Sequence, residues 1–141
     1  MSNKYHIIGA GLSGLTLALE LAKKRNKLAQ LYIKNLRDCK DVVNIEINKN
    51  NTYVFHQFVI RANKRDSLIK YLRKSGIDTM IHYPYMLNEL KFFKFSKKLK
   101  KAYKLGGKIL SLPISEEHSE KEIKFFSKLI KIFFSNKNIF K

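Results

Sequence analysis

Apolar residues cluster in three runs of strand length along the chain. Thr52 to Arg61 is dense in β-branched and aromatic residues, which predicts a mostly buried strand. A second run, Ile77 to Tyr83, predicts a strand stopped by Pro84. A third, Leu110 to Ile114, predicts a short strand whose Pro113 indicates a sheet edge. Together the runs predict a small three-stranded sheet.

Between these runs the apolar positions recur at helical spacing. One helix continues or restarts after Lys24, and a second begins near Asn63 and ends with Gly76 as its C-cap. A short basic helix is expected over residues 99–105, and a capping box over 119–122 opens a final helix. The predicted apolar faces are Leu28, Leu31, Tyr32 and Leu36; Leu68, Ile69 and Leu72; and Ile123, Phe126, Leu129, Ile130 and Phe133. Helices alternating with three short strands predict an α/β (α+β) fold.

The N-terminal segment has a different pattern. Residues 4–9 favour a strand, and the motif Gly9-x-Gly11-x-x-Gly14 connects it to a strong helix former, Leu15 to Ala22. In a dinucleotide-binding unit such glycines allow a tight turn and a close approach of the backbone to a pyrophosphate. The segment resembles the start of FAD- or NAD(P)-binding oxidoreductases, which makes Gly9, Gly11 and Gly14 candidate cofactor-binding residues.

The second half of that fingerprint is missing. An acidic residue should end a second strand about 20 positions further on, but the nearest candidate, Leu28 to Lys34, carries a lysine there, and we favour a helix. We therefore expect residues 1–24 to form a partial dinucleotide-binding-like strand, turn and helix, and residues 25–141 to form the main domain.

Length and composition limit the chain to one globular domain. It has 141 residues, of which 45% are hydrophobic and 12% aromatic, enough for a core. The formal net charge is +18, which attracts polyanions. The alternative is that lysines only fill solvated faces in a sequence with an AT-rich coding bias.

Two basic segments raise the question of nucleic acid or anionic membranes. Lys91 to Lys101 interleaves aromatic residues with lysines, and the helix from Lys124 to Phe134 could lie on anionic lipid. Both segments coincide with elements whose apolar faces are expected to cover the sheet. Neither partner is therefore expected, although a basic nucleic-acid or membrane-binding domain stays an alternative.

Cysteine and hydropathy bear on the compartment. Cys39 is the only cysteine, so no internal disulfide is expected, and no Cys/His cluster has the spacing of a metal site. No apolar stretch reaches the length of a membrane span. These features predict a soluble, cytoplasmic protein without a structural metal.

Five motifs in order carry a family resemblance. They resemble the C-terminal small domain of the DegT/DnrJ/StrS aminotransferases, over about residues 24–134, including a preceding helix with Arg25 and Tyr32. The motifs are His56 to Arg61, Arg65 to Leu68 with Leu72, Gly76-Ile77, Ile81-His82-Tyr83-Pro84, and Leu110 to Ile114. The resemblance implies a fold-type I small domain and a parent enzyme that uses pyridoxal phosphate to aminate nucleotide-linked keto-sugars for sugar and O-antigen polysaccharide biosynthesis.

The resemblance also implies what the chain lacks. The cofactor lysine and the other pyridoxal phosphate contacts belong to a large domain with no matching segment here, and Lys108 matches the small domain instead. We therefore predict no catalytic residue and no transamination by this chain alone. The expected function is a truncated or fused small domain of a nucleotide-sugar aminotransferase, the alternative being an FAD- or NAD(P)-binding module. The expected partner is a large domain or a second copy of the chain.

His82 and Tyr83 are the candidate substrate-binding residues. By resemblance their element lies near the substrate, where an imidazole and a phenol can hydrogen-bond sugar hydroxyls or phosphate. The alternative is that both are structural residues at a strand end. The family continues with a second Pro and a second His, where this chain has Met86 and Asn88. His56, Gln57 and Arg61 are expected to be structural, by capping backbone groups or forming ion pairs.

Overall fold

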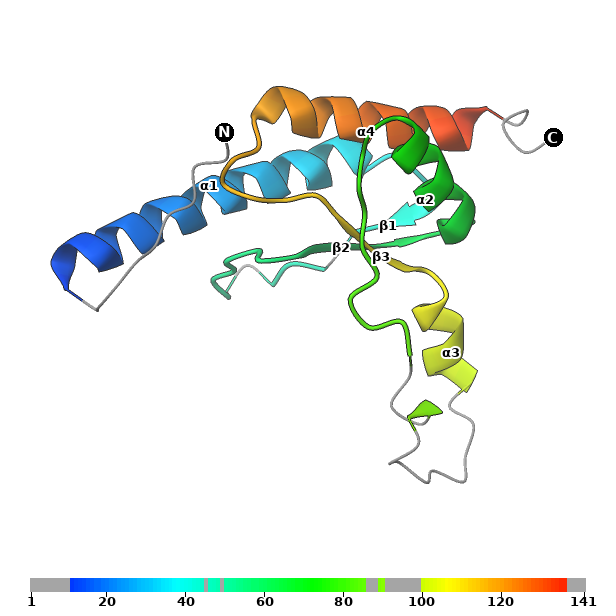
Figure 1. Ribbon diagram of the computed structural model, residues 1–141, viewed down its shortest axis with the longest axis horizontal. Helices are drawn as coiled ribbons and strands as arrows, with labels where there is room; N and C mark the ends of the chain where they lie inside the picture. The colour runs from blue at the N-terminus through cyan, green and yellow to red at the C-terminus, as the bar shows by residue number, and fades with distance from the viewer. Residues whose placement is uncertain (1–10, 45, 49, 86–88, 91–99, 137–141) are drawn as a thin grey trace.

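A three-stranded antiparallel sheet with helices over one face forms the body of the protein (Figure 1). The computed structural model describes residues 11–44, 46–48, 50–85, 89–90 and 100–136. The elements are α1 (Leu12–Leu36), β1 (Val42–Val43), β2 (Phe58–Ala62), α2 (Arg65–Lys74), α3 (Lys100–Gly106), β3 (Ile109–Leu112) and α4 (Glu120–Ser135). The strand order is β1-β2-β3, and α1 and α4 pack side by side. The predicted fold class and a sheet of three strands are confirmed, whereas the strand predicted over residues 4–9 lies outside the described residues.

One strand of the sheet is not the one predicted. The run Ile77 to Tyr83 pairs at a single residue, where Met80 and Ser111 exchange backbone hydrogen bonds of 2.8 and 3.1 Å. Ile77 instead turns into the core, at 3% exposure. The free edge of β2 is taken by β1, in a stretch for which no strand was predicted.

The central strand begins later than predicted, at Phe58 instead of Thr52. Phe55 has a φ of 44°, in the left-handed region that interrupts a strand. This turn puts the Phe55 side chain into the core and leaves Val54 exposed. A periodicity pattern does not detect it, because the residues on both sides still favour strands.

The helices follow the sequence closely. The capping box of α4 is confirmed, since the Glu122 amide donates to Ser119 Oγ and the Ser119 amide donates to the Glu122 carboxylate. Gly76 follows α2 with a φ of 76°, as expected for a C-cap glycine. The first helix is one continuous element of 25 residues that crosses the expected boundary at residue 24.

Tyr32 is at the centre of the core. Its ring is fully buried and stacks on Phe58, with 4.7 Å between the ring centroids. Its hydroxyl donates a 2.8 Å hydrogen bond to the carbonyl of Pro113. Burial raises the pKa of this phenol far above its ordinary value, so the hydroxyl stays a neutral donor. One side chain thus joins α1, β2 and the segment after β3.

Two ion pairs fix α1 to the segment that leads into α4. Arg25 Nη2 lies 2.6 Å from the Glu116 carboxylate, and both side chains are partly buried. Lys27 pairs with Glu120 at 2.7 Å in a more exposed position. A hydrogen bond from its own backbone N–H and the nearby Arg25 guanidinium lower the pKa of Glu116. This carboxylate therefore stabilises the fold in its charged form.

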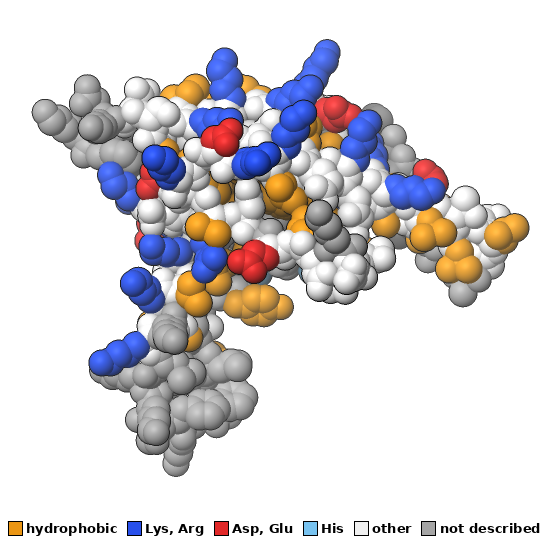
Figure 2. Space-filling model, turned by 180° about the vertical axis from the view of Figure 1, so that it is seen from behind, with side chains coloured by type: hydrophobic (Ala, Val, Ile, Leu, Met, Phe, Trp, Pro, Cys, Tyr) orange, Lys and Arg blue, Asp and Glu red, His pale blue; other side chains and the backbone are white. Residues whose placement is uncertain are grey.

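The N-terminal half of α1 extends beyond the body (Figure 1). Leu12, Leu15 and Leu19 lie on one face of this half and are 84%, 53% and 61% exposed. Figure 2 shows hydrophobic side chains gathered at this projecting end. No helix in the described part of the chain has the length and hydrophobicity to span a membrane. We call the three leucines the α1 stripe.

Replacing Tyr32 by Phe tests the central contact. Tyr32→Phe keeps the stacked ring but leaves the Pro113 carbonyl without its donor, so we expect a loss of about 1–2 kcal/mol in the free energy of unfolding. Urea denaturation measures it. The matched control is Tyr83→Phe, at an exposed phenol, which should change stability by less than about 0.5 kcal/mol. Equal effects in the two variants would contradict the assignment.

The Glu116 pair predicts a dependence of stability on pH. Because its pKa is lowered in the folded state, the carboxylate contributes stability above its ordinary pKa of 4.5, and this contribution is lost as the pH falls below that value. Glu116→Gln should therefore lower the melting temperature at pH 7 and change it little at pH 3. The control Glu46→Gln, at an exposed position, should leave both melting temperatures unchanged. A Glu116→Gln effect of equal size at both pH values would refute the prediction.

Candidate functional site

Three separate segments meet where β2 begins and β3 ends. They enclose a cavity of about 270 Å³, which we call the His82 pocket. The antiparallel register places Phe58 opposite Leu112, so the residues before β2 lie beside those after β3. The pocket is lined by His56, Gln57, Asp78, Thr79, Met80, His82, Ser111, Leu112, Pro113 and Ile114.

Local backbone geometry positions the two histidines. His56 follows the left-handed turn at Phe55, which buries the Phe55 ring and leaves His56 exposed at the pocket. His82 is held near by the hydrogen bonds between Met80 and Ser111. Tyr83 does not line the pocket and is 83% exposed to solvent. The structure thus brings His82 together with His56 and separates it from Tyr83.

Asp78 and Thr79 are pocket residues that the sequence analysis did not single out. Both fall within the run expected to be a strand, where nothing distinguishes them from other residues. Thr79 Oγ1 is buried and has no hydrogen-bond partner among the described residues. Buried hydroxyls normally have a partner. The pocket wall therefore has an unused donor and acceptor.

His56, Gln57 and Arg61, which belong to the first family motif, lack the hydrogen bonds and ion pairs expected of them among the described residues. Neither His56 nor Gln57 hydrogen-bonds another described residue through its side chain, and Arg61 forms no ion pair within the described ranges. The expectation that they cap backbone groups or form ion pairs is therefore not met in this part of the chain. Within the described residues, the side chains of His56 and Gln57 line the pocket without a hydrogen-bond partner.

The His82 pocket has groups for recognition. Two imidazoles, a carboxylate, an amide and two hydroxyls can hydrogen-bond hydroxyl or phosphoryl groups. Its volume lies below the roughly 300–1,000 Å³ that small-molecule sites usually have. It therefore has the size of one wall or one end of a larger site.

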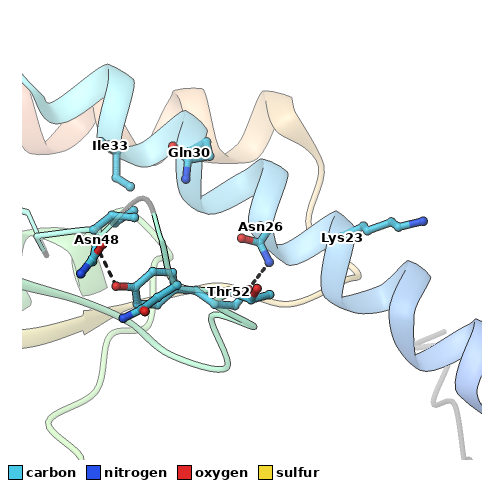
Figure 3. Close-up of a pocket in the computed structure, with 9 residues that line it drawn as sticks. Lys23, Asn26, Gln30, Ile33, Asn48 and Thr52 are labelled. Carbon is cyan, nitrogen blue, oxygen red and sulfur yellow. Dashed lines mark hydrogen bonds between the residues drawn. The ribbon is translucent and has the colours of Figure 1, made fainter.

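A larger hollow of about 700 Å³ lies under the middle of α1 (Figure 3). Asn26 and Gln30 point from α1 toward the facing segment, whereas Lys23 extends away. The side-chain amide of Asn26 donates to the Tyr53 carbonyl, and the backbone N–H of Asn48 donates to the Tyr53 hydroxyl at 3.0 Å. No histidine, cysteine or acidic residue of the described chain lines this hollow. Its described lining offers amide hydrogen bonds, and its one charged side chain, Lys23, extends away from the hollow and pairs with Glu20.

The three candidate glycines do not form a described strand and turn. Gly9 lies outside the described residues, Gly11 is the N-cap of α1, and Gly14 is in its first turn. A Cβ atom at Gly11 would meet nothing within 4 Å. In the described part of the chain no close backbone approach requires glycine at this position. Met86 and Asn88 also lie outside the described residues.

Comparisons with known proteins identify one family. Residues 9–130 match the model of the DegT/DnrJ/EryC1/StrS aminotransferase family. The chain is 32% identical to a pleiotropic regulatory protein of Geobacillus stearothermophilus over 118 residues, which are 79% of this chain and 32% of that protein. It is 33% identical over 98 residues to a dTDP-3-amino-3,4,6-trideoxy-α-D-glucose transaminase of Micromonospora megalomicea, covering 64% of this chain and 26% of that enzyme.

A solved structure agrees with these matches. The crystal structure of a DegT DnrJ EryC1 StrS aminotransferase from Brucella abortus superposes with a TM-score of 0.79 at 26% identity, covering 89% of this chain and 34% of that one. The chain thus spans about a third of the length of the relatives it matches. The comparisons do not support the resemblance of the glycine segment to FAD- or NAD(P)-binding oxidoreductases, because the family match already begins at Gly9.

Proposed function

The chain belongs to the DegT/DnrJ/EryC1/StrS aminotransferase family, and we propose that it acts as the small domain of a nucleotide-sugar aminotransferase. In this proposal the His82 pocket supplies one wall of the substrate site. The other walls come from the part of such an enzyme that corresponds to the unmatched two thirds of the relatives. The observation that carries it is the His82 pocket, where His56, Gln57 and His82 from two family motifs meet in one cavity.

Two features of the pocket support a role on the sugar side of the substrate. Its polar groups are hydrogen-bonding groups suited to hydroxyls, and the orphaned Thr79 hydroxyl can join them. Three relatives are named for transamination of a nucleotide-linked sugar. The substrate class that we propose for this site is therefore a nucleotide-linked sugar.

Pyridoxal phosphate, on which the family depends, does not fit the described residues of the His82 pocket. The cofactor needs a lysine for its covalent attachment, and no lysine lines this cavity. Lys108 is half-buried, but it lies at the other end of the sheet and donates to Asn63 at 2.7 Å. We derive no chemical step for this chain and assign it substrate contacts only.

The α1 stripe is the surface that we assign to the remaining part of the enzyme. It lies within the residues matched by the family model, yet no described residue of this chain covers it. The relatives contain about twice as much additional chain as the part matched here. We propose that the cofactor-bearing part of such an enzyme packs on the stripe.

Binding of nucleotide sugars to the chain tests the proposed substrate side. We expect UDP-N-acetylglucosamine or dTDP-glucose to shift the backbone NMR signals of residues 56–57 and 78–82 with a weak Kd, on the order of 1 mM, because only one wall is present. His82→Ala should weaken binding about tenfold through the loss of one hydrogen-bonding group.

The control for this variant is His118→Asn. This change removes an imidazole that contacts Ser115 at 2.7 Å outside the pocket, and it should leave the Kd unchanged. Signal changes confined to other segments, or equal effects of the two substitutions, would refute the proposed site.

The α1 stripe predicts self-association of the chain alone. Exposed leucines on one helix face favour contact between copies when no other surface covers them. In sedimentation velocity we expect a concentration-dependent dimer or larger species, and Leu15→Gln combined with Leu19→Gln should restore a monomer.

Ser13→Gln combined with Lys24→Gln is the matched control, because both residues lie on the other side of α1. These substitutions should leave the association unchanged. A monodisperse monomer of the unmodified chain would contradict the prediction.

A further inference from the structure

A second cluster of functional groups lies at the opposite end of β2 from the His82 pocket. Four basic side chains, Lys40, Arg61, Lys104 and Lys108, line a cavity of about 180 Å³ with Asp41 as the one carboxylate. We call it the Arg61 pocket. Phe58 and Ala62 mark the two ends of β2, so about 13 Å of strand separates the two sites.

The register of the sheet places Arg61 on the face away from α1 and α4. Along β2, Phe58, Ile60 and Ala62 are buried, whereas Arg61 is exposed. Its partners in the neighbouring strands are Val43 and Ile109, which are also exposed. Directly paired residues project on the same face. Arg61 therefore lies between two exposed aliphatic residues on the face of the sheet opposite the buried residues of β2.

Hydrogen bonds fix the side chain of Lys108 in the cavity. Its ammonium donates to Asn63 Oδ1 at 2.7 Å, and the Asn63 amide donates to Asp41 Oδ1 at 2.9 Å. The backbone is fixed too, because the Ala62 amide donates to the Lys108 carbonyl at 2.9 Å. Asp41 is thus bonded to an amide, and Lys108 has ammonium protons left for a ligand.

The segment that carries Lys104, at the end of α3, and Lys108, between α3 and β3, is also held in place. Arg65 Nη1 donates to the Ile109 carbonyl at 3.2 Å and contacts the Gly106 carbonyl at 3.5 Å. The Lys108 amide donates to the Leu105 carbonyl at 2.9 Å. Lys104 and Lys108 therefore come from a held segment before β3, Arg61 comes from the central strand β2, and Lys40 comes from the segment between α1 and β1.

None of the four cations has a carboxylate partner among the described residues, and Lys108 bonds only the neutral Asn63 side chain. Lys40, Arg61 and Lys104 form no ion pair with any residue of the described ranges. Elsewhere Arg25 and Lys27 do find carboxylates. Figure 2 shows how far Lys and Arg outnumber acidic side chains over the visible face, so convergence on one cavity distinguishes this cluster.

We propose that the Arg61 pocket binds a phosphoryl group, with Arg61 and Lys108 as its main contacts. An arginine guanidinium matches two oxygens of a phosphate, and a lysine ammonium adds a point charge. The flanking Val43 and Leu105 are apolar and exposed, and they offer a surface to an organic group attached to the phosphate. The site is independent of the His82 pocket and of the proposed sugar specificity.

Calorimetric titration with inorganic pyrophosphate and with uridine diphosphate, in 0.15 M NaCl, tests the proposal. We expect saturable one-to-one binding with a Kd below about 1 mM. Tighter binding of uridine diphosphate assigns the phosphoryl group to a nucleotide, and equal affinities assign it to a free phosphate. Either result supports the site.

Substitutions locate the binding. Arg61→Gln and Lys104→Gln should each weaken pyrophosphate binding, Arg61→Gln by about tenfold or more. Lys104 makes no hydrogen bond with the described residues, so Lys104→Gln tests the site without disturbing the Asn63 network. The matched control Lys74→Gln removes one positive charge at the end of α2 and should change the Kd less than twofold.

Two results would overturn the proposal. One is the absence of saturable pyrophosphate binding in 0.15 M NaCl. The other is an equal loss of affinity in Lys74→Gln and Arg61→Gln, which would mean attraction by the net charge of +18 alone. His82→Ala should leave pyrophosphate binding unchanged, so failure of this site and failure of the proposed sugar site are distinguishable.

Discussion

The hydrogen bond from the buried Tyr32 hydroxyl to the Pro113 carbonyl is the contact on which the rest of the arrangement depends. It joins the middle of α1 to the segment that leaves β3, and the same ring stacks on Phe58 at the start of β2. Pro113 also lines the His82 pocket. Because this partly buried carbonyl receives its donor from Tyr32, the position of α1 and the shape of this pocket are linked through one side chain.

The sheet separates two kinds of surface chemistry. At one end of β2, histidines and small polar groups surround the His82 pocket, and at the other end cations surround the Arg61 pocket. The antiparallel register assembles both, since it brings the residues before β2 beside those after β3, and the residues after β2 beside those before β3. Residues far apart in sequence therefore meet at both sites because the two strands that carry them are paired.

The helices could be predicted from sequence, because their signals are local. A capping box, a C-cap glycine and a repeated apolar face each depend on a few neighbouring residues, and Ser119, Gly76 and Tyr32 all lie as expected. The strand β1 could not be predicted. Val42 and Val43 are too short a run to read as a strand, and they pair only because β2 has a free edge.

The candidate site was predicted in part for the same reason. His82 could be found from its motif, but its partners depend on the turn at Phe55 and on the single pairing of Met80 with Ser111. The glycine motif was misleading in the opposite way. Its spacing suits a phosphate-binding turn followed by a helix and a second strand. The helix that contains Gly14 instead continues to Leu36, through the positions where the second strand was required. A helix N-terminus after glycines is common to both arrangements, so only the elements that follow distinguish them.

The two halves of α1 differ in their packing: the described residues bury the C-terminal half in the core, but they leave apolar residues of the N-terminal half exposed. Its C-terminal half contributes Leu28, Ala29, Tyr32 and Leu36 to the closed core, so this half folds with the sheet. Its N-terminal half presents Leu12, Leu15 and Leu19 to solvent, although an isolated helical segment of this kind gains little stability from propensity alone. The two halves thus have different requirements. One is satisfied by the domain itself, and the other requires a second surface, which a chain spanning a third of its relatives' length does not supply in its described part.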